Sequence, residues 1–376
     1  MTRTVGVEEE MILVDLGTGR PLSVSGAVLA KATQSLGQDP AAKVGIVPRG
    51  AVEGEFQQQQ LEIHTSPVVD LADLDAELRH WRGLAIELAE SVGAGLVALG
   101  TSPMAFAPRS VPSPRYQEIR DLLGLTARQH LTCACHVHVN VESDEEGVAV
   151  MDRVRVWLPV LLAVSANSPY WQGEDTGYAS YRTQALTLWP SFGPPERFGS
   201  AAAYHRLVSI MLDSGALLDE GMIYWDMRLS ARYPTVEIRS ADVCLDVADT
   251  VFVAALCRGL VESAARDWRR GEPAPDVPTS LLRVATWQAA RYGVDGDLID
   301  PLTMRRAPAR DVVASLVSYV AAALDEDGDR LVVDRGAERL WTRGTGASRQ
   351  RRTMERTGRL VDVVDEALRL TANQDA

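Results

Sequence analysis

Cysteine is scarce in this chain, with only four residues among 376. They are Cys133, Cys135, Cys244 and Cys257. Four thiols are too few to form the disulfide framework of a secreted protein of this length. We therefore expect a reducing, cytoplasmic setting.

Long apolar runs and an excess of basic charge are also missing. The longest apolar stretches, residues 156–164 and 312–324, fall well short of the roughly 20 residues that a bilayer span needs. A strand-like pattern begins within five residues of the N-terminus, which leaves no room for a signal peptide. The 38 basic and 51 acidic residues give a net charge of -13, which repels nucleic acid and anionic membranes. We expect a soluble protein that acts on small molecules.

The chain also lacks internal repeats, low-complexity tracts and long linkers rich in Gly, Ser or Pro. Its 46% hydrophobic and 24% charged residues are typical of globular proteins. We expect residues 1–376 to form a single domain.

Strands and long helices alternate along the chain. Alternation of β-branched and aromatic residues predicts strands at 4–14, 56–64, 95–100, 131–141, 222–229 and 234–239. Apolar residues at three- and four-residue spacing predict helices at 70–92, 147–165, 200–214, 246–268, 278–291, 308–324 and 348–370. The last two strands resemble a hairpin. We predict an α+β fold, in which helices cover one face of a mainly antiparallel sheet.

The first strand carries three consecutive acids, Glu8, Glu9 and Glu10, among apolar neighbours. Because side chains alternate faces along a strand, Glu8 and Glu10 share one face, and Glu9 lies with the apolar residues on the other. Burying these charges without partners would cost roughly several kcal/mol, so a cation or arginines should face them. A solvated strand face is the alternative, which this segment alone leaves open.

The second strand repeats this pattern. Alternation puts Gln58, Gln60 and Glu62 on one face, with Glu55 near the start of the strand. Two strands of the predicted sheet therefore each present acids on one face.

The strand at 131–141 contains Cys-x-Cys-His-x-His, a spacing that invites a zinc interpretation. Alternation instead puts His136 and His138 on one face and Cys133 and Cys135 on the other. One regular strand cannot direct all four ligands to one ion, so a structural zinc is disfavoured. We predict that the cysteines are small core residues.

The predicted hairpin adds charges of both signs. Its polar faces carry Tyr224, Asp226, Arg228, Thr235, Glu237 and Arg239. A single acid–base pair is usually a surface salt bridge without function. Four strands that each have acids, His or Arg on one face and apolar groups on the other instead favour a sheet with a polar concave binding face.

The residue types on this face indicate hard-cation chemistry. Carboxylates with an imidazole suit Mg²⁺ or Mn²⁺, and Mg²⁺ commonly joins protein carboxylates to substrate phosphates. Nearby arginines would neutralise a transferring phosphoryl group, so the predicted reagent is ATP. The chain has no Gly-x-x-x-x-Gly-Lys-Ser/Thr loop, and Gly344-Thr-Gly-Ala347 is too isolated to count as a dinucleotide signature. We expect the sheet itself to bind the nucleotide.

Several ordered motifs are similar to those of a known family. They are Gly6-Val-Glu-Glu-Glu10, Cys133-Ala-Cys-His-Val-His138, Ala166-Asn-Ser-Pro169, Asp175-Thr-Gly-Tyr-Ala-Ser-Tyr-Arg182, the segment from Tyr224 to Arg239, Arg291-Tyr-Gly293 and the segment from Gly344 to Arg351. The chain thus resembles the carboxylate-amine ligases of the glutamate-cysteine ligase type 2 family. The resemblance implies a glutamine-synthetase-like fold, in which the open concave face of a curved, mainly antiparallel sheet binds Mg²⁺, ATP and an amino acid carboxylate.

The resemblance also implies a reaction. ATP phosphorylates a carboxylate, typically the γ-carboxylate of glutamate, and an amine, typically that of cysteine, displaces phosphate from the acyl phosphate to form an amide. The alternatives are a phosphotransferase of the guanidino-kinase type on the same broader fold, a metal-dependent hydrolase and a binding protein without catalysis. The family suggests a homodimer.

Residue roles follow from the same resemblance. The implied metal ligands are Glu8, Glu10, Glu55, Glu62, His138 and Glu237. Arg239 would contact the γ-phosphate, and Arg228 would help to bind phosphates or the acyl phosphate. Arg182 and Tyr178 are candidates for binding the α-carboxylate of the acceptor substrate, although packing is an equal alternative for Tyr178. The sequence does not identify the base that takes a proton from the amine.

Some positions depart from the family pattern. Ala134 and Asn140 stand where relatives commonly have glycine, and Ser102-Pro103 stands where many have His-Pro. Added side chains at strand glycines narrow a neighbouring pocket. The identities of the acid and the amine therefore stay open.

Overall fold

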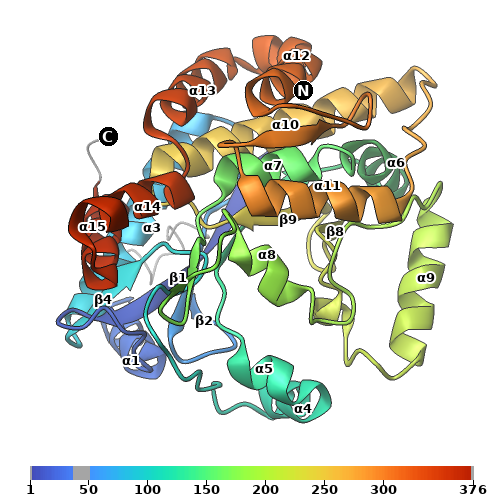
Figure 1. Ribbon diagram of the computed structural model, residues 1–376. Coiled ribbons are helices and arrows are strands. Elements are labelled where there is room, and N and C mark those ends of the chain that lie inside the picture. The colour runs from blue at the N-terminus through green and yellow to red at the C-terminus, as the bar shows by residue number, and fades with distance from the viewer. Residues whose placement is uncertain (1, 37–50, 374–376) are drawn as a thin grey trace.

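A seven-stranded sheet forms the centre of the computed structural model, which describes residues 2–36 and 51–373 (Figure 1). The strand order is β2-β3-β1-β5-β9-β8, β4 also pairs with β1, and every pairing is antiparallel. The strands are β1 (Val5–Asp15), β2 (Ala51–Gly54), β3 (Gln60–His64), β4 (Ala94–Val97), β5 (Ala134–Asn140), β8 (Met227–Leu229) and β9 (Thr235–Asp242). Two small ladders lie outside the sheet: β6 (Tyr170–Trp171) with β7 (Glu174–Asp175), and β10 (Asp297–Asp300) with β11 (Arg305–Pro308).

Helices surround this sheet (Figure 1). They are α1 (Ser25–Leu36), α3 (Leu71–Glu90), α4 (Pro114–Leu123), α5 (Leu125–Gln129), α6 (Asp144–Val154), α7 (Leu158–Ser165), α8 (Tyr181–Leu186), α9 (Ala201–Asp213), α10 (Val247–Arg269), α11 (Thr279–Tyr292), α12 (Ala309–Asp327), α13 (Arg330–Arg343), α14 (Gly346–Thr357) and α15 (Leu360–Ala372). The C-terminal helix α15 packs on β4 and α3, so the end of the chain returns to the sheet.

The apolar face of the sheet packs against α10, a helix of 23 residues. This helix contacts β1, β5 and β9 on one side and α6, α12 and α13 on others. Val7, Val137 and Ile238 point into this core and are no more than 2% exposed. Their burial confirms that the apolar residues of the three strands share the helix-covered face.

Cross-strand pairing aligns the polar residues on the opposite face. Arg228 of β8 pairs with Glu237 of β9, and Glu237 pairs with His138 of β5. On the same face, towards the opposite edge of the sheet, Glu10 of β1 pairs with Glu62 of β3. Residues that are far apart in sequence thus form one continuous polar surface, as strand alternation predicts.

Glu9 points into the core, where Arg82 of α3 neutralises it. The two side chains are 0% and 1% exposed and form a two-pronged ion pair, with Nε to Oε2 and Nη2 to Oε1 both at 2.6 Å. The Thr250 hydroxyl of α10 donates a third hydrogen bond to Glu9 at 2.6 Å. The middle acid of the triplet therefore joins β1 to α3 and α10, which confirms its predicted facing and explains its burial.

Two of the predicted helices are each divided in two. The segment 147–165 forms α6 and α7, because Pro159 in the first turn of α7 has no N–H and its ring would clash with a carbonyl of a continuous helix. The segment 348–370 is divided at Gly358, which ends α14 in the left-handed conformation with φ of 71°. The patterns also missed α1, α4, α5, α8, α13, β2, β6, β7, β10 and β11.

The predicted strand at 56–64 is shorter than expected, because β3 begins only at Gln60. Before it, side-chain amides bind loop carbonyls: Gln57 donates to Ala127, and Gln58 donates to Ser110 at 2.9 Å. The prediction that Gln58 shares the polar face with Gln60 and Glu62 is therefore wrong. In sequence, a run of glutamines whose side chains bind loop carbonyls has the same alternating pattern as a strand.

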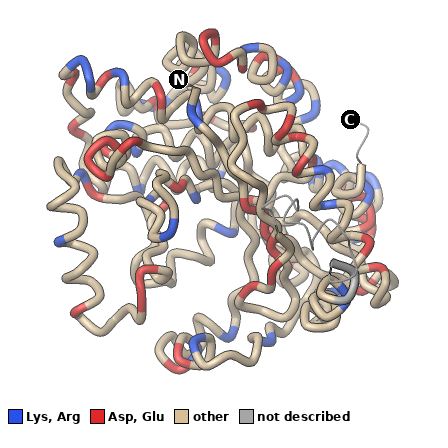
Figure 2. The backbone as a smooth tube through the Cα atoms, turned by 180° about the vertical axis from the view of Figure 1, so that it is seen from behind, with Lys and Arg blue, Asp and Glu red and all other residues tan. Residues whose placement is uncertain are grey.

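Basic and acidic positions are interspersed over the outer helices (Figure 2). Within residues 2–36 and 51–373, the structure has no helix with the length and apolar character needed to cross a membrane.

Candidate active site

A cavity of about 1100 Å³ lies over the polar face of the sheet. Its floor comes from β1, β3, β5, β8 and β9, and its walls include α4, α8 and the segment 219–226. Nine of the predicted site residues line it: Glu8, Glu10, Glu55, Glu62, His138, Arg182, Arg228, Glu237 and Arg239. The fold thus brings together side chains from five strands, one helix and the segment between β2 and β3.

Two groups of potential metal ligands share one carboxylate on this floor. Glu8, His138 and Glu237 form the first group, and Glu8, Glu62 and His136 form the second, with the ligand atoms of each group within 4.8 Å of one another. The first group thus consists of three predicted ligands, and the second group contains two, Glu8 and Glu62. His138 Nε2 is buried and lies 3.3 Å from Glu8 Oε1, so these two potential ligands are in direct contact.

Glu10 and Glu55 line the cavity outside these two groups. One oxygen of Glu10 accepts a hydrogen bond from the Ala134 backbone N–H at 2.8 Å, and Glu55 accepts one from the N–H of Phe56 at 2.8 Å. The other oxygen of Glu10 lies 4.0 Å from His136 Nε2, and Glu55 makes no ion pair among the described residues.

The acids of the floor strongly perturb one another. Burial and then the neighbouring Glu55 raise the pKa of Glu10 to about 8. Burial and then Glu55, Glu8 and Glu10 raise the pKa of Glu62 well above its usual range. Against the opposing effect of burial, hydrogen bonds with His136, His138 and His64 lower the pKa of Glu8. Buried carboxylates that repel one another are strongly stabilised by a bound cation.

Arg228 and Arg239 bind the same acid, Glu237. Arg228 contacts it through Nε at 2.8 Å and Nη2 at 3.2 Å, and Arg239 contacts it through Nη1. Although burial opposes ionisation, these two arginines lower the pKa of Glu237. The floor therefore places two guanidinium groups directly beside the first ligand group.

Arg182 projects from α8 to the inner end of the cavity and is only 4% exposed. Its Nη2 donates to the carbonyl of Arg239 at 3.0 Å, and its Nη1 lies 3.5 Å from Asp242. Its Nε is buried without a partner. The guanidinium is thus held rigidly and retains one free donor.

Tyr178 differs from Arg182, the other predicted substrate-binding residue, because it does not line the cavity. Its hydroxyl accepts a hydrogen bond from Trp287 Nε1 at 3.2 Å, and the Arg291 guanidinium lies 5.4 Å from its ring centre. This environment agrees with the packing alternative.

Sequence reasoning left several lining residues out of the site. His136 belongs to the second ligand group, although alternation had already put it on the same face as His138. Arg115 and Tyr116 of α4, Trp189 after α8 and Gln60 of β3 also line the cavity. The wall residues lie in segments whose patterns carried no functional signal.

The two cysteines of the Cys-x-Cys-His-x-His motif are buried in the core, as predicted. Cys133 and Cys135 are both 0% exposed and lie in different apolar clusters. Among the described residues, neither contributes to a group of potential metal ligands.

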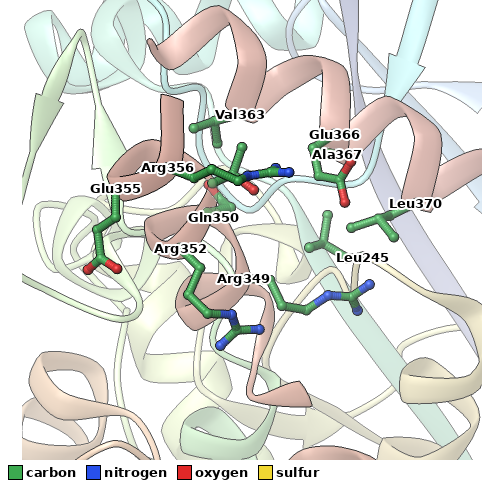
Figure 3. A pocket seen from close by; sticks show the side chains of 11 residues that line it. Leu245, Arg349, Gln350, Arg352, Glu355, Arg356, Val363, Glu366, Ala367 and Leu370 are labelled. Carbon is green, nitrogen blue, oxygen red and sulfur yellow. The ribbon is translucent and has the colours of Figure 1, made fainter. Parts of the chain in front are cut away.

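A second cavity, of about 660 Å³, lies between α14 and α15 and contains several arginines (Figure 3). Arg349 is paired with Asp246 at 3.0 Å, and Arg352 donates to the carbonyl of Arg343. Acids line the same cavity at Glu355 and Glu366. Its charges are largely balanced, and it lacks the grouped carboxylates and histidines of the larger cavity.

A mainly antiparallel sheet that carries acids, histidines and arginines on one open face is typical of the glutamine-synthetase-like fold, and solved structures agree with this fold. A bifunctional glutathione synthetase from Pasteurella multocida has a TM-score of 0.67 at 15% identity, covering 99% of this chain and 53% of that chain. The glutamate–cysteine ligase of Francisella tularensis, solved in complex with AMP, has a TM-score of 0.65 at 12% identity, covering 99% of this chain and 89% of that chain. The predicted fold class is confirmed.

The sequence comparisons identify the family. The model of glutamate-cysteine ligase family 2 matches residues 4–366, and this chain belongs to that family. A relative from Streptomyces avermitilis, which bears the name glutamate–cysteine ligase 2-1, is 51% identical over 369 residues, covering 98% of this chain and 99% of the relative. A second, from Streptomyces coelicolor, is 48% identical with the same coverage.

Proposed function

We propose that this protein is an ATP-dependent carboxylate–amine ligase that forms an amide bond through an acyl phosphate. The observation that carries this proposal is the convergence of two ligand groups and two arginines on one sheet face, in a member of glutamate-cysteine ligase family 2. The donor is proposed to be the γ-carboxylate of glutamate and the acceptor an amino acid amine. The comparisons do not support the alternative of a guanidino-kinase-type phosphotransferase.

The residues of the floor fit a divalent cation. Oxygen donors with one imidazole in each group suit Mg²⁺, with Mn²⁺ as a second choice, and the raised pKa values of Glu10 and Glu62 reflect a need for positive charge. Glu8, Glu62, His138 and Glu237 would hold the ions, with His136, Glu10 and Glu55 as further ligands. Bound there, Mg²⁺ would neutralise the phosphate oxygens of ATP and the reacting carboxylate.

Arg239 and Arg228 are proposed to act on the transferred phosphoryl group. Both side chains line the cavity beside Glu237. Arg239 stays charged because Glu237 raises its pKa against the opposing effect of burial. A fixed pair of cations stabilises the charge that develops on a phosphoryl group without reorganisation during the reaction. Arg182 is proposed to bind a substrate carboxylate at the inner end of the cavity.

Several broader assignments also belong to this proposal. Residues 1–376 are proposed to act as one domain, since α15 packs on β4 and α3 next to the strand that carries Glu8. Four buried, unpaired thiols support a cytoplasmic setting. The homodimer rests on the family resemblance alone.

A pairwise substrate screen tests the reaction. We expect ADP release with Mg²⁺ when a dicarboxylic amino acid and an amine are both supplied, slow release with the acid alone, and an amide detectable by mass spectrometry. Hydroxylamine in place of the amine should trap the acyl phosphate as a hydroxamate. A stable phosphorylated product, or hydrolysis without ATP, would contradict the proposal.

A further inference from the structure

Asp226 is a buried acid in the wall of the active-site cavity that no assigned role uses. It lies directly before β8, is 3% exposed and lines the cavity. Its Oδ2 is buried and has no hydrogen-bond partner. A buried, unpartnered carboxylate oxygen costs free energy unless a bound ligand satisfies it.

Three arginines surround Asp226 without satisfying it. Arg182, Arg239 and Arg283 all act electrostatically on the carboxyl, yet burial outweighs them and raises the pKa of Asp226 to about 7. Asp226 forms no ion pair within 4.0 Å among the described residues, because these guanidinium groups bind elsewhere or lie farther away. The acid is therefore open to a small cationic group from the cavity.

Arg182, one of these three arginines, has one buried donor, Nε, that is left for an anion. Arg182 is held against the carbonyls of Arg239 and Ser240, and the Arg239 N–H donates to the carbonyl of Asp226 at 2.8 Å. Arg182 and Asp226 thus flank the same stretch of β9, one with a free Nε and the other with a free Oδ2. A buried cation and a buried anion that do not pair with each other are complementary to a zwitterion.

We propose that Asp226 binds the α-ammonium group of the amino acid that supplies the reacting carboxylate, while Arg182 binds its α-carboxylate. This inference rests on the proposed ligase function and names the residues that would recognise the head group of its donor.

The chemistry of the reaction assigns this pair of residues to the donor. An amine attacks an acyl phosphate only after it has lost its proton, so an ammonium group that Asp226 holds throughout the reaction is not the nucleophile. The ammonium group bound by Asp226 therefore belongs to the donor, the substrate whose side-chain carboxylate reacts. The sequence suggested that Arg182 binds the acceptor, whereas this inference assigns Arg182 to the donor.

A comparison of glutamate with glutarate tests this inference, because glutarate differs from glutamate only in lacking the α-amino group. Hydroxylamine serves as the acceptor, so that no second amino acid is present, and hydroxamate formation gives kcat/KM for each acid. We expect the wild-type enzyme to prefer glutamate. Asp226→Asn should reduce the glutamate-to-glutarate ratio about 10- to 100-fold, the range for losing a charge-assisted hydrogen bond.

Asp219→Asn is the matched control, because Asp219 lines the same cavity but is already bound to Arg115 at 2.6 Å. It should leave the ratio unchanged. Turnover of glutarate by Asp226→Asn shows that this variant is folded. An unaltered ratio in Asp226→Asn, or equal wild-type use of both acids, would overturn the inference, whereas a wild-type enzyme that makes no hydroxamate from either acid would overturn the ligase function on which it rests.

Discussion

Replacing Glu8 with Gln is expected to reduce Mg²⁺-dependent ADP formation about 100- to 1000-fold, the cost of removing one preorganised electrostatic group from an active site. Glu8 is the only residue common to both ligand groups among the described residues, so its loss disrupts both at once. Gln keeps the shape of the side chain but removes the charge. Initial rates across an Mg²⁺ titration measure the effect, and calorimetry measures cation binding directly.

Glu53→Gln makes the same chemical change at the edge of the same cavity. Its carboxylate is 59% exposed and contacts only His64 among the charged side chains described, at 3.6 Å. We expect this control to retain activity and its dependence on Mg²⁺. Full activity of Glu8→Gln at saturating Mg²⁺ would contradict the assignment of the metal site.

Replacing Arg82 with Met is expected to lower the free energy of unfolding by about 3–5 kcal/mol, because it leaves the carboxylate of Glu9 buried without its countercharge. The pair is almost completely inaccessible and links β1 to α3. Urea denaturation followed by circular dichroism measures the change. Glu9→Gln should likewise act mainly on stability, in contrast to its neighbour Glu8.

The double variant Glu9→Gln with Arg82→Met should recover part of the lost stability, since no uncompensated charge then remains buried. Arg369→Met is a control on an exposed pair with Glu366, which contributes at most about 1 kcal/mol. If Arg82→Met and Arg369→Met had equal effects on stability, the buried pair would not have the structural role that its position indicates.

The facing of the acidic triplet could be predicted because it depends only on the local geometry of a strand. The two-residue repeat of β1 put Glu8 and Glu10 on one face and Glu9 on the other, and the same reasoning sorted His136 and His138 from the adjacent cysteines. It did not depend on knowing which strands are neighbours. The family motifs then supplied the fold and the reaction.

Other parts of the site depend on tertiary contacts that no local pattern reveals. Gln58 has the alternation of a strand residue, yet its amide binds a loop carbonyl and leaves the polar face. Arg82 is an ordinary arginine in a helical pattern until the fold brings it to Glu9. Asp226 was on the correct face, but its missing partner became visible only when the surrounding arginines were located.

The fate of the donor oxygen atoms tests the central claim most directly. Glutamate labelled with oxygen-18 in its γ-carboxylate is incubated with ATP, Mg²⁺ and an acceptor amine, and the released phosphate is analysed by mass spectrometry. Attack of the carboxylate on ATP followed by displacement of phosphate predicts that each phosphate released carries one oxygen-18 atom from the donor. Amide formation with unlabelled phosphate would contradict an acyl phosphate and the mechanism proposed for this cavity.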